Sequence, residues 1–216
     1  PYAVYYIDIT SQAGQSASYV VKITSGSFRA TFTDVSSKFW AANYINTAYQ
    51  MGITTGSAQS DGTVAFNPNG KATRQEVAIF ICNLLGINAN AYSNKKLSYT
   101  DSAAIAKWAQ NAVKAVTAQG IMEGSGKKFN PTANITRQEF MAVMVRAAKL
   151  DTSKGSAGVL NAFKDKNKIA SWAKVYVQTA VTYKLVNGDN GYIKPNADIT
   201  RAEIVKIMVC AKDFVR

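Results

Sequence analysis

The chain has 216 residues, of which 47% are hydrophobic, and its 25 Lys and Arg against 13 Asp and Glu give a net charge of +12. This size fits one compact domain or a few tightly packed small ones, and the charge favours an anionic partner such as an acidic polysaccharide, a membrane surface or nucleic acid. The sequence contains no His, which excludes a His-based catalytic triad and a Cys2His2 zinc site.

Residues 1–31 differ in composition from the rest of the chain. The stretches 2–9 and 18–24 are rich in Tyr, Val, Ile and Thr, so they predict short β-strands joined by turns. An isolated hairpin is barely stable, and we therefore expect this β-rich segment to pack on the helical body or on a neighbouring subunit. Because the chain begins at Pro1 without a signal peptide, we expect it to be a processed or excised piece.

The remaining residues repeat one pattern three times. Each copy begins with an aromatic residue, any residue and Asp, and a Trp follows six or seven positions later inside an apolar helical pattern. In the first two copies a Gly-Ile pair ends this predicted helix, because Gly suits the left-handed position after a helix. A second Gly precedes a turn containing Pro, whose preceding residue is expected to be extended. The predicted modules, with their linkers, are residues 32–98, 99–162 and 163–216.

A Thr-Arg motif starts the second predicted helix of each module. It reads Thr-Arg-Gln-Glu at 73–76 and 136–139, and Thr-Arg-Ala-Glu at 200–203. Thr-x-x-Glu has the form of a capping box, which explains the Thr and the Glu. It leaves the Arg unexplained, because the helix dipole disfavours a cation at the first helical position. Three Arg at one offset suggest a shared task, either holding an anion or forming a structural ion pair, for which the module-start Asp is a candidate partner: Arg74, Arg137 and Arg201.

The three modules differ from one another at two places, and each of them is small. Module 1 has nine residues between Gly56 and Phe66, where module 2 has four in the corresponding loop, and module 3 has Lys184 in place of the helix-ending Gly. Repeats of about 64 residues are too small for a robust core, so we expect the modules to share one. Cys82 and Cys210 lie among apolar residues and are expected to be buried thiols, although spacing does not decide whether they form a disulfide.

This combination resembles the S-layer homology (SLH) domain over about residues 32–216. The resemblance implies a mainly α fold of three helix–loop–helix modules in a pseudo-threefold bundle, and secretion to the bacterial cell wall, S-layer or cell surface. It also implies non-covalent binding of a pyruvylated secondary cell wall polysaccharide, or of modified peptidoglycan, in grooves between modules. The ligand-binding residues carried over are the three Arg named above, with Asp34, Asp101, Asp165, Trp40, Trp108 and Trp172.

The chemistry of such a ligand agrees with these residue types. Arg binds a carboxylate with two parallel N–H bonds, free N–H groups at a helix start add anion affinity, and Trp supplies a face for a sugar ring. A structural role competes at each position: the Asp precedes a helix and would cap it, and the Trp lies on an apolar face that would pack in the core. The glycines are turn formers that also let a ligand approach: Gly56, Gly124 and Gly188.

The sequence therefore predicts a cell-wall-anchoring module with three weak sites on one polymer. One alternative is a self-assembling subunit of a surface layer or filament, with residues 1–31 joining chains into a homo-oligomer. Another is a polysaccharide-modifying enzyme, but we find no pair of carboxylates arranged for glycoside cleavage and expect no enzymatic activity, cofactor or metal. The scattered Lys argue against nucleic acid as a partner, and no apolar run is long enough to span a membrane.

Overall fold

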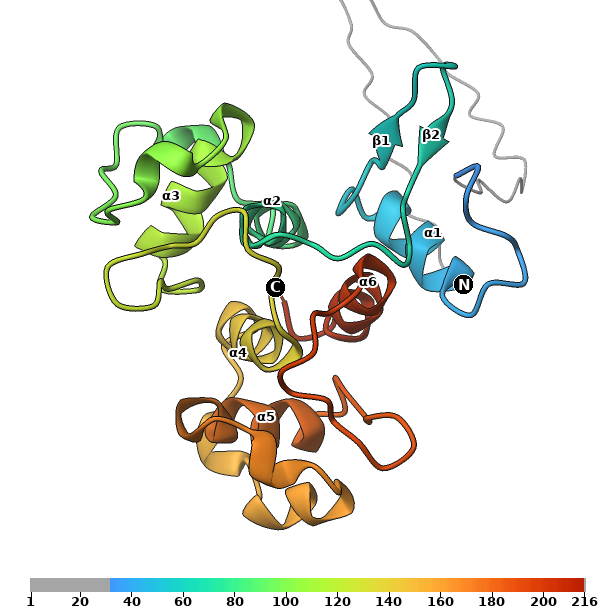
Figure 1. The fold of residues 1–216 in the computed structure, drawn as a ribbon, viewed down its shortest axis with the longest axis vertical. Coiled ribbons are helices and arrows are strands. Elements are labelled where there is room, and N and C mark those ends of the chain that lie inside the picture. Colours follow the sequence, from blue (N-terminus) through green and yellow to red (C-terminus); the bar gives the residue numbers. More distant parts are fainter. Residues whose placement is uncertain (1–31, 216) are drawn as a thin grey trace, which may run out of the picture.

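The computed structural model describes residues 32–215, so the predicted β-rich segment 1–31 lies outside the described residues. Three inner helices surround the middle of the molecule, and three outer helices lie around them, as Figure 1 shows end-on. The expectation of a mainly α, pseudo-threefold bundle is confirmed. In chain order the helices are α1 (Ala42–Gln50), α2 (Arg74–Leu84), α3 (Gln110–Ala118), α4 (Arg137–Ala147), α5 (Lys174–Thr182) and α6 (Arg201–Cys210).

Short elements fill the connections. The extra residues of module 1 form an antiparallel hairpin of β1 (Ser57–Ala58) and β2 (Val64–Ala65), whereas the corresponding turns of modules 2 and 3 hold a single bridge each. The insertion therefore lengthens an existing turn. The 3-10 helices are η1 (Ala89–Tyr92), η2 (Ser102–Ala104), η3 (Lys107–Ala109), η4 (Thr152–Lys154), η5 (Ala157–Ala162), η6 (Lys166–Lys168) and η7 (Ser171–Ala173).

The helix ends show why the missing Gly of module 3 is tolerated. Gly52 and Gly120 follow α1 and α3 with φ of +70° and +67°, as their sequence predicts. Lys184 takes the same left-handed conformation after α5, with φ of +58°. The next residue, Leu185, donates its backbone N–H to Ala180 O at 2.9 Å, so the hydrogen bond at the helix end is preserved. The backbone of Lys184 is strained in this conformation because the residue has a Cβ.

The residues before Pro68, Pro131 and Pro195 are not extended, and that prediction was wrong. Asn67, Asn130 and Lys194 have φ of +57°, +55° and +53°. Their backbone N–H groups donate to the Asp at the start of the same module, and these bonds hold the turn in its left-handed form. Asn tolerates this conformation better than most residues do, which fits two of the three positions.

The two helices of one module do not form a packed pair. Instead α3 packs on α2, α5 packs on α4, and α1 packs on α6 (Figure 1). Each lobe thus combines the Thr-Arg helix of one module with the outer helix of the next. The contact of α1 with α6 joins the first module to the last and closes the ring, so the boundaries of the repeat in sequence are not the boundaries of the lobes.

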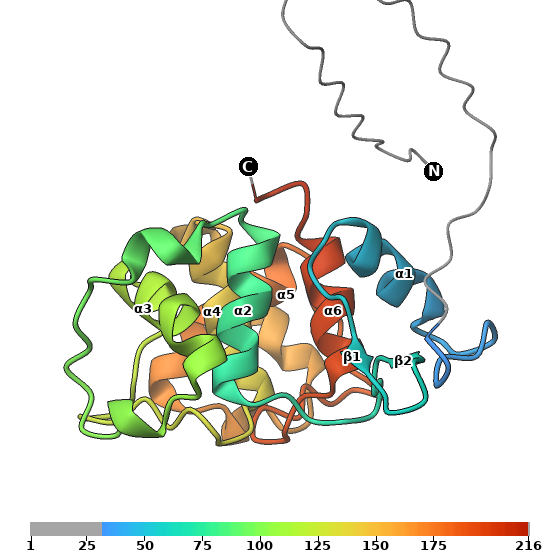
Figure 2. The same cartoon turned by 90° about the horizontal axis from the view of Figure 1, so that it is seen from above.

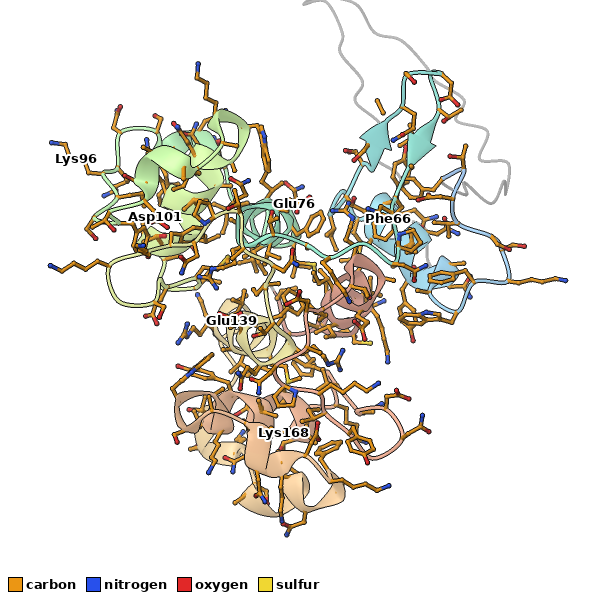
Figure 3. The ribbon with its side chains drawn as sticks, viewed as in Figure 1. Phe66, Glu76, Lys96, Asp101, Glu139 and Lys168 are labelled. Carbon is orange, nitrogen blue, oxygen red and sulfur yellow. The ribbon has the colours of Figure 1, made fainter. Side chains whose placement is uncertain are left out.

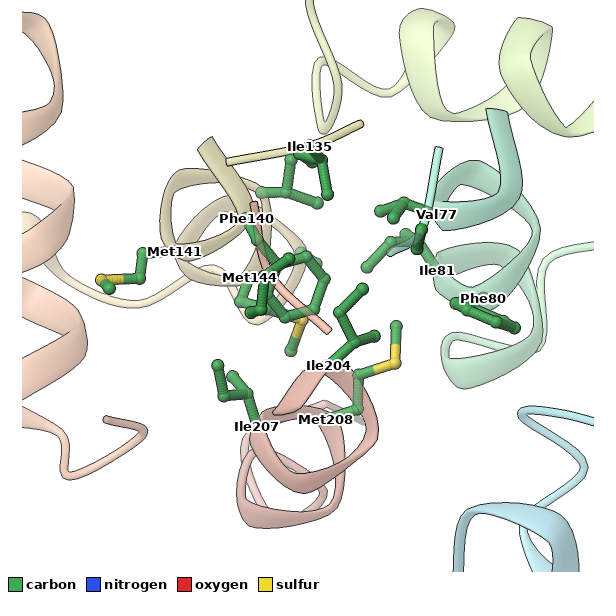
Figure 4. Close-up of a cluster of buried hydrophobic side chains, with 14 of the residues drawn as sticks. Val77, Phe80, Ile81, Ile135, Phe140, Met141, Met144, Ile204, Ile207 and Met208 are labelled. Atoms are coloured by element: carbon green, nitrogen blue, oxygen red, sulfur yellow. The ribbon is translucent and has the colours of Figure 1, made fainter. Parts of the chain in front are cut away.

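One core lies between the inner helices. Figure 4 shows side chains from α2, α4 and α6 meeting there, and the loop residue Ile135 joins them. Fully burying an aliphatic side chain of this size stabilises a fold by roughly 1.5–3 kcal/mol, and here each helix needs the other two to bury its own. The residues at this centre are fully buried: Val77, Ile81, Ile135, Phe140, Met144, Ile204 and Met208.

The remaining sequence expectations concern the thiols and the membrane. Cys82 is buried on α2 and Cys210 is half-buried on α6, and both are free thiols, so the structure does not contain the disulfide that the sequence left open. Desolvation by burial raises the pKa of Cys82 to about 11, which keeps it protonated and unreactive at neutral pH. Among the helices of residues 32–215, none has the length and apolar character needed to cross a bilayer.

We predict that Lys184→Gly stabilises the protein by about 1 kcal/mol, because it removes the left-handed strain on a residue with a Cβ. Urea denaturation measures the change. The matched control is Gly120→Lys, which places the same strain after α3 and should lower the free energy of unfolding by about 1–2 kcal/mol. Equal stability of Lys184→Gly and the parent chain would contradict this account.

We predict that residues 98–150 alone do not unfold cooperatively. This fragment contains α3 and α4, whose packing partners α2 and α5 are both absent from it. It therefore leaves the apolar faces of both helices in water, and about 53 residues cannot compensate with a core of their own. Thermal unfolding followed by circular dichroism checks this, and a sharp transition would refute the shared core.

Candidate functional site

The Thr-Arg motifs lie where three modules meet. Each forms the predicted capping box at the start of an inner helix: Thr136 N donates to Glu139 Oε2 at 2.8 Å, and Glu139 N donates to Thr136 Oγ1. The same box begins α2 and α6. The Arg of each motif occupies the first helical position and is buried, with only 7–8% of its surface exposed.

Each of these Arg reaches into the following module. Arg74 of module 1 donates from Nε to Phe129 O at 2.8 Å and from Nη2 to Glu123 O at 2.7 Å, both in module 2. Its Nη1 lies 3.4 Å from Glu139 Oε1. Desolvation lowers the pKa of Arg74, and the neighbouring Glu139 opposes that shift, so the Arg stays charged at neutral pH.

The same contacts recur around the ring. Arg137 donates from Nε to Ile193 O at 2.9 Å and pairs with Glu203 of module 3 at 2.7 Å. Arg201 of module 3 donates to Phe66 O at 2.8 Å and pairs with Glu76 of module 1 at 3.4 Å, which closes the cycle. The structural ion pair considered from the sequence is therefore present, but its partner is the Glu of the next Thr-Arg motif.

The motif Glu serves two helices at once. In Glu139, Oε2 accepts from Thr136 of its own capping box and Oε1 accepts from Arg74 of the preceding module. Glu76 and Glu139 lie on the inner helices in Figure 3, whereas Lys96 projects from the rim. Because a single carboxylate caps its own helix and binds the previous Arg, the register of the three modules is fixed by one residue type.

The inner helices do not offer free N–H groups at their starts, contrary to the expectation from sequence. Arg74 N donates to Ala133 O at 2.9 Å and Gln75 N donates to Pro131 O at 3.0 Å. The corresponding N–H groups of α4 and α6 bind carbonyls of modules 3 and 1 in the same way. The loop after each Pro therefore takes the place that an anion would need at the start of the previous module's inner helix. In Figure 2 the loops that lead into the inner helices run along one face of the molecule.

The Asp at the start of each module binds the same loop that accepts a hydrogen bond from a motif Arg. Asp101 accepts from Phe129 N at 2.8 Å and from Asn130 N at 2.7 Å, and Phe129 O in turn accepts from Arg74. Asp34 and Asp165 bind the equivalent peptides of modules 1 and 3. The prediction that these Asp cap a helix was wrong. The side chains of Asp101 and Asp165 make no capping hydrogen bond to the 3-10 helix that follows them. Both carboxylate oxygens are turned to the loop instead.

The three Trp are exposed, so packing in the core was also the wrong alternative. Trp40, Trp108 and Trp172 have 55%, 59% and 52% of their surfaces exposed. The sequence pattern placed them inside the outer helices, but Trp40 precedes α1, and the other two lie in η3 and η7 before α3 and α5. Each module thus presents a large aromatic surface to solvent at an equivalent place.

Glycine is required at positions 56, 124 and 188 because the aromatic ring at the start of each module packs against the loop. A Cβ on Gly56 or Gly188 would lie 2.5 Å from the ring of Phe32 or Phe163, and both glycines have φ of +72°. A Cβ on Gly124 would clash with Lys128 O and lie 2.6 Å from the ring of Tyr99. These residues therefore form turns, as the sequence suggested, and they let the module-start aromatic ring seal the loop.

A cavity of about 400 Å³ brings several predicted residues together. Trp40 of module 1, Arg137 of module 2 and Gly188 of module 3 all line it, so three modules build one site. Asp165 is not part of its lining. The other lining residues come from module 3: Leu185, Val186, Asn187, Asp189, Glu203, Lys206 and Ile207.

Comparison with known proteins agrees with this architecture. The sequence model of the S-layer homology domain matches residues 31–78, 98–141 and 162–205, one match in each module. The chain belongs to the S-layer homology family. As SLH modules bind cell wall polymers and are not themselves catalytic, this chain is a secreted, cell-wall-associated anchoring region.

Named relatives share this region in larger proteins. The chain is 30% identical to the surface-layer 125 kDa protein of Lysinibacillus sphaericus over 92% of its length, 29% identical to an amylopullulanase of Thermoanaerobacterium thermosulfurigenes over 95%, and 27% identical to the S-layer protein sap of Bacillus anthracis over 82%. It spans only 16%, 12% and 21% of those proteins. Sequences similar to this SLH region therefore occur both in proteins named as surface-layer proteins and in one named as an amylopullulanase.

Sequence reasoning missed Lys206 among the residues of the SLH cavity. It lies on α6 five positions after Arg201, where α2 has Ile79 and α4 has Ala142. Aligning the three Thr-Arg helices would have revealed this difference. Only residues shared by all three modules were predicted to be functional, so a residue present in one module was not considered.

We predict that Asp101→Asn lowers the free energy of unfolding by roughly 1–3 kcal/mol at pH 7, because it weakens two charge-assisted bonds that hold an SLH loop. Desolvation opposes the charged form of Asp101, but the N–H groups of Phe129 and Asn130 outweigh it and lower its pKa. A carboxyl whose pKa is lower in the folded state stabilises above its unfolded pKa of about 3.9, and loses that contribution as pH falls through the folded pKa. Urea titrations should therefore show the gap between the two proteins closing below pH of about 4. A gap independent of pH would contradict this role.

Proposed function

We propose that this chain anchors its protein by binding an anionic, pyruvylated secondary cell wall polysaccharide in the grooves between SLH modules. The observation that carries the proposal is the cavity in which the exposed Trp40 lies beside Arg137 and Lys206. A sugar that bears a pyruvate ketal has an apolar ring face and a carboxylate. The cavity offers an indole for the first and two cations for the second.

The contacts of Arg137 decide how a carboxylate would bind. Its Nε and Nη1 are occupied by Ile193 O and Glu203, while Nη2 has no hydrogen bond within residues 32–215. The parallel two-bond grip expected from sequence needs two free N–H groups on one edge of the guanidinium. The carboxylate is therefore held by Nη2 together with the ammonium of Lys206, which has no ion-pair partner among the described residues.

Binding by several grooves raises the affinity for a polymer. Once one groove holds a repeating unit, the next unit is presented to a second groove at high effective concentration. The net charge of +12 adds long-range attraction to an anionic chain. Peptidoglycan remains the second candidate polymer, and self-association through residues 1–31 stays a prediction that rests on their composition.

We predict that Trp40→Ala weakens binding to pyruvylated cell walls roughly three- to tenfold, because it removes the stacking surface while the half-exposed Trp contributes little to the core. Co-sedimentation with purified walls, before and after mild acid removal of the ketal, measures the loss. Phe214→Ala is the matched control, since Phe214 is 41% exposed, is aromatic and does not line the cavity. Normal binding by a folded Trp40→Ala protein, or equal binding to both wall preparations, would refute the proposal. An Arg variant is a poorer test, because each motif Arg also joins two modules.

A further inference from the structure

We infer that the three grooves are unequal, and that the groove lined by Trp40, Arg137 and Lys206 is the primary site for the carboxylate-bearing sugar. Lys206 is the residue that makes it so. This inference rests on the proposed function. It adds which groove binds the sugar first and which side chain gives that groove its higher affinity.

The charges of this groove leave one cation uncompensated. Glu203 is paired with Arg137 at 2.7 Å, and Asp189 is paired with Lys194 at 2.7 Å. Both acids of the lining are thus neutralised by a neighbour. Lys206 is half-buried and has no such partner in the part of the chain that the structure describes, so it gives the lining of the cavity a net positive charge.

The equivalent position differs in the other two grooves. By the threefold repeat, the groove with Trp108 and Arg201 has Ile79 where this one has Lys206, and the groove with Trp172 has Ala142. Neither side chain attracts an anion. A carboxylate there lacks the ammonium that Lys206 supplies in the primary groove, and the motif Arg is paired with a motif Glu in all three.

The Trp172 groove has one further disadvantage. Arg74 is the Arg of this groove, and its Nη2 donates to Glu123 O at 2.7 Å, so the nitrogen that has no hydrogen bond in Arg137 is engaged here. The exposed side chain of Glu123, at the position of Asn187 in the primary groove, is paired with Arg146 at 3.1 Å and so adds no net charge. The grooves should therefore fill in the order Trp40, Trp108, Trp172.

The three Trp supply one reporter for each groove. We would record the isotope-labelled indole N–H signals of the folded chain while titrating a methyl hexosaminide that bears a pyruvate ketal, with the ketal-free glycoside as control. We expect the Trp40 signal to move at about tenfold lower sugar concentration than the other two, the size of effect that one charge-assisted bond produces. Lys206→Ala should remove this advantage and leave the other signals unchanged.

A gain-of-function variant completes the test. Ile79→Lys puts the ammonium into the Trp108 groove at an equally half-buried position, and its aliphatic stem replaces part of the Ile contact. Its Trp108 signal should then respond together with Trp40. If all three signals of the parent chain move at one concentration, or if Lys206→Ala changes nothing, the inference is wrong while the proposed function stands. If no indole responds to the pyruvylated sugar, the proposed function fails and takes the inference with it.

Discussion

The contact on which the rest of this structure depends is a buried Arg that crosses from one module into the next. It grips a loop carbonyl and the motif Glu there, and the loop is itself held by the module-start Asp. Each such charge-assisted hydrogen bond contributes roughly 1.5–3 kcal/mol, and each is made three times around a closed cycle. Because every Arg acts on a module other than its own, no module reaches its final form without its neighbours.

This crossing explains why the lobes are offset from the repeat. The loop that receives the Arg comes directly after the outer helix of its own module. That outer helix packs on the inner helix that carries the Arg, so α3 packs on α2 and α5 packs on α4. The last such pair joins α1 to α6 and makes the assembly a ring. The cavity lies where the Trp of one module meets the loop of another, and its lining residues are up to 167 positions apart in the chain, from Trp40 to Ile207.

Three departures from the repeat differ in their consequences within this symmetric frame. Lys184 keeps the left-handed turn that a Gly forms in the other modules, so the groove it borders is intact. The insertion in module 1 only extends a surface turn into the β1–β2 hairpin. Lys206, by contrast, changes the charge of one groove without altering the fold, because it lies on the outer side of an inner helix.

The sequence by itself determined the number of modules, the capping boxes, the left-handed helix ends and the need for a shared core, because these follow from local hydrogen bonding and from the size of the repeat. Tertiary structure alone decided what the Arg, Asp and Trp do. The partners of Arg74 lie 49 to 65 residues away, and the exposure of Trp40 depends on where its helix begins. A repeat in sequence shows which residues share a task, but only the packing of one module on the next shows which of them remain free to bind a ligand.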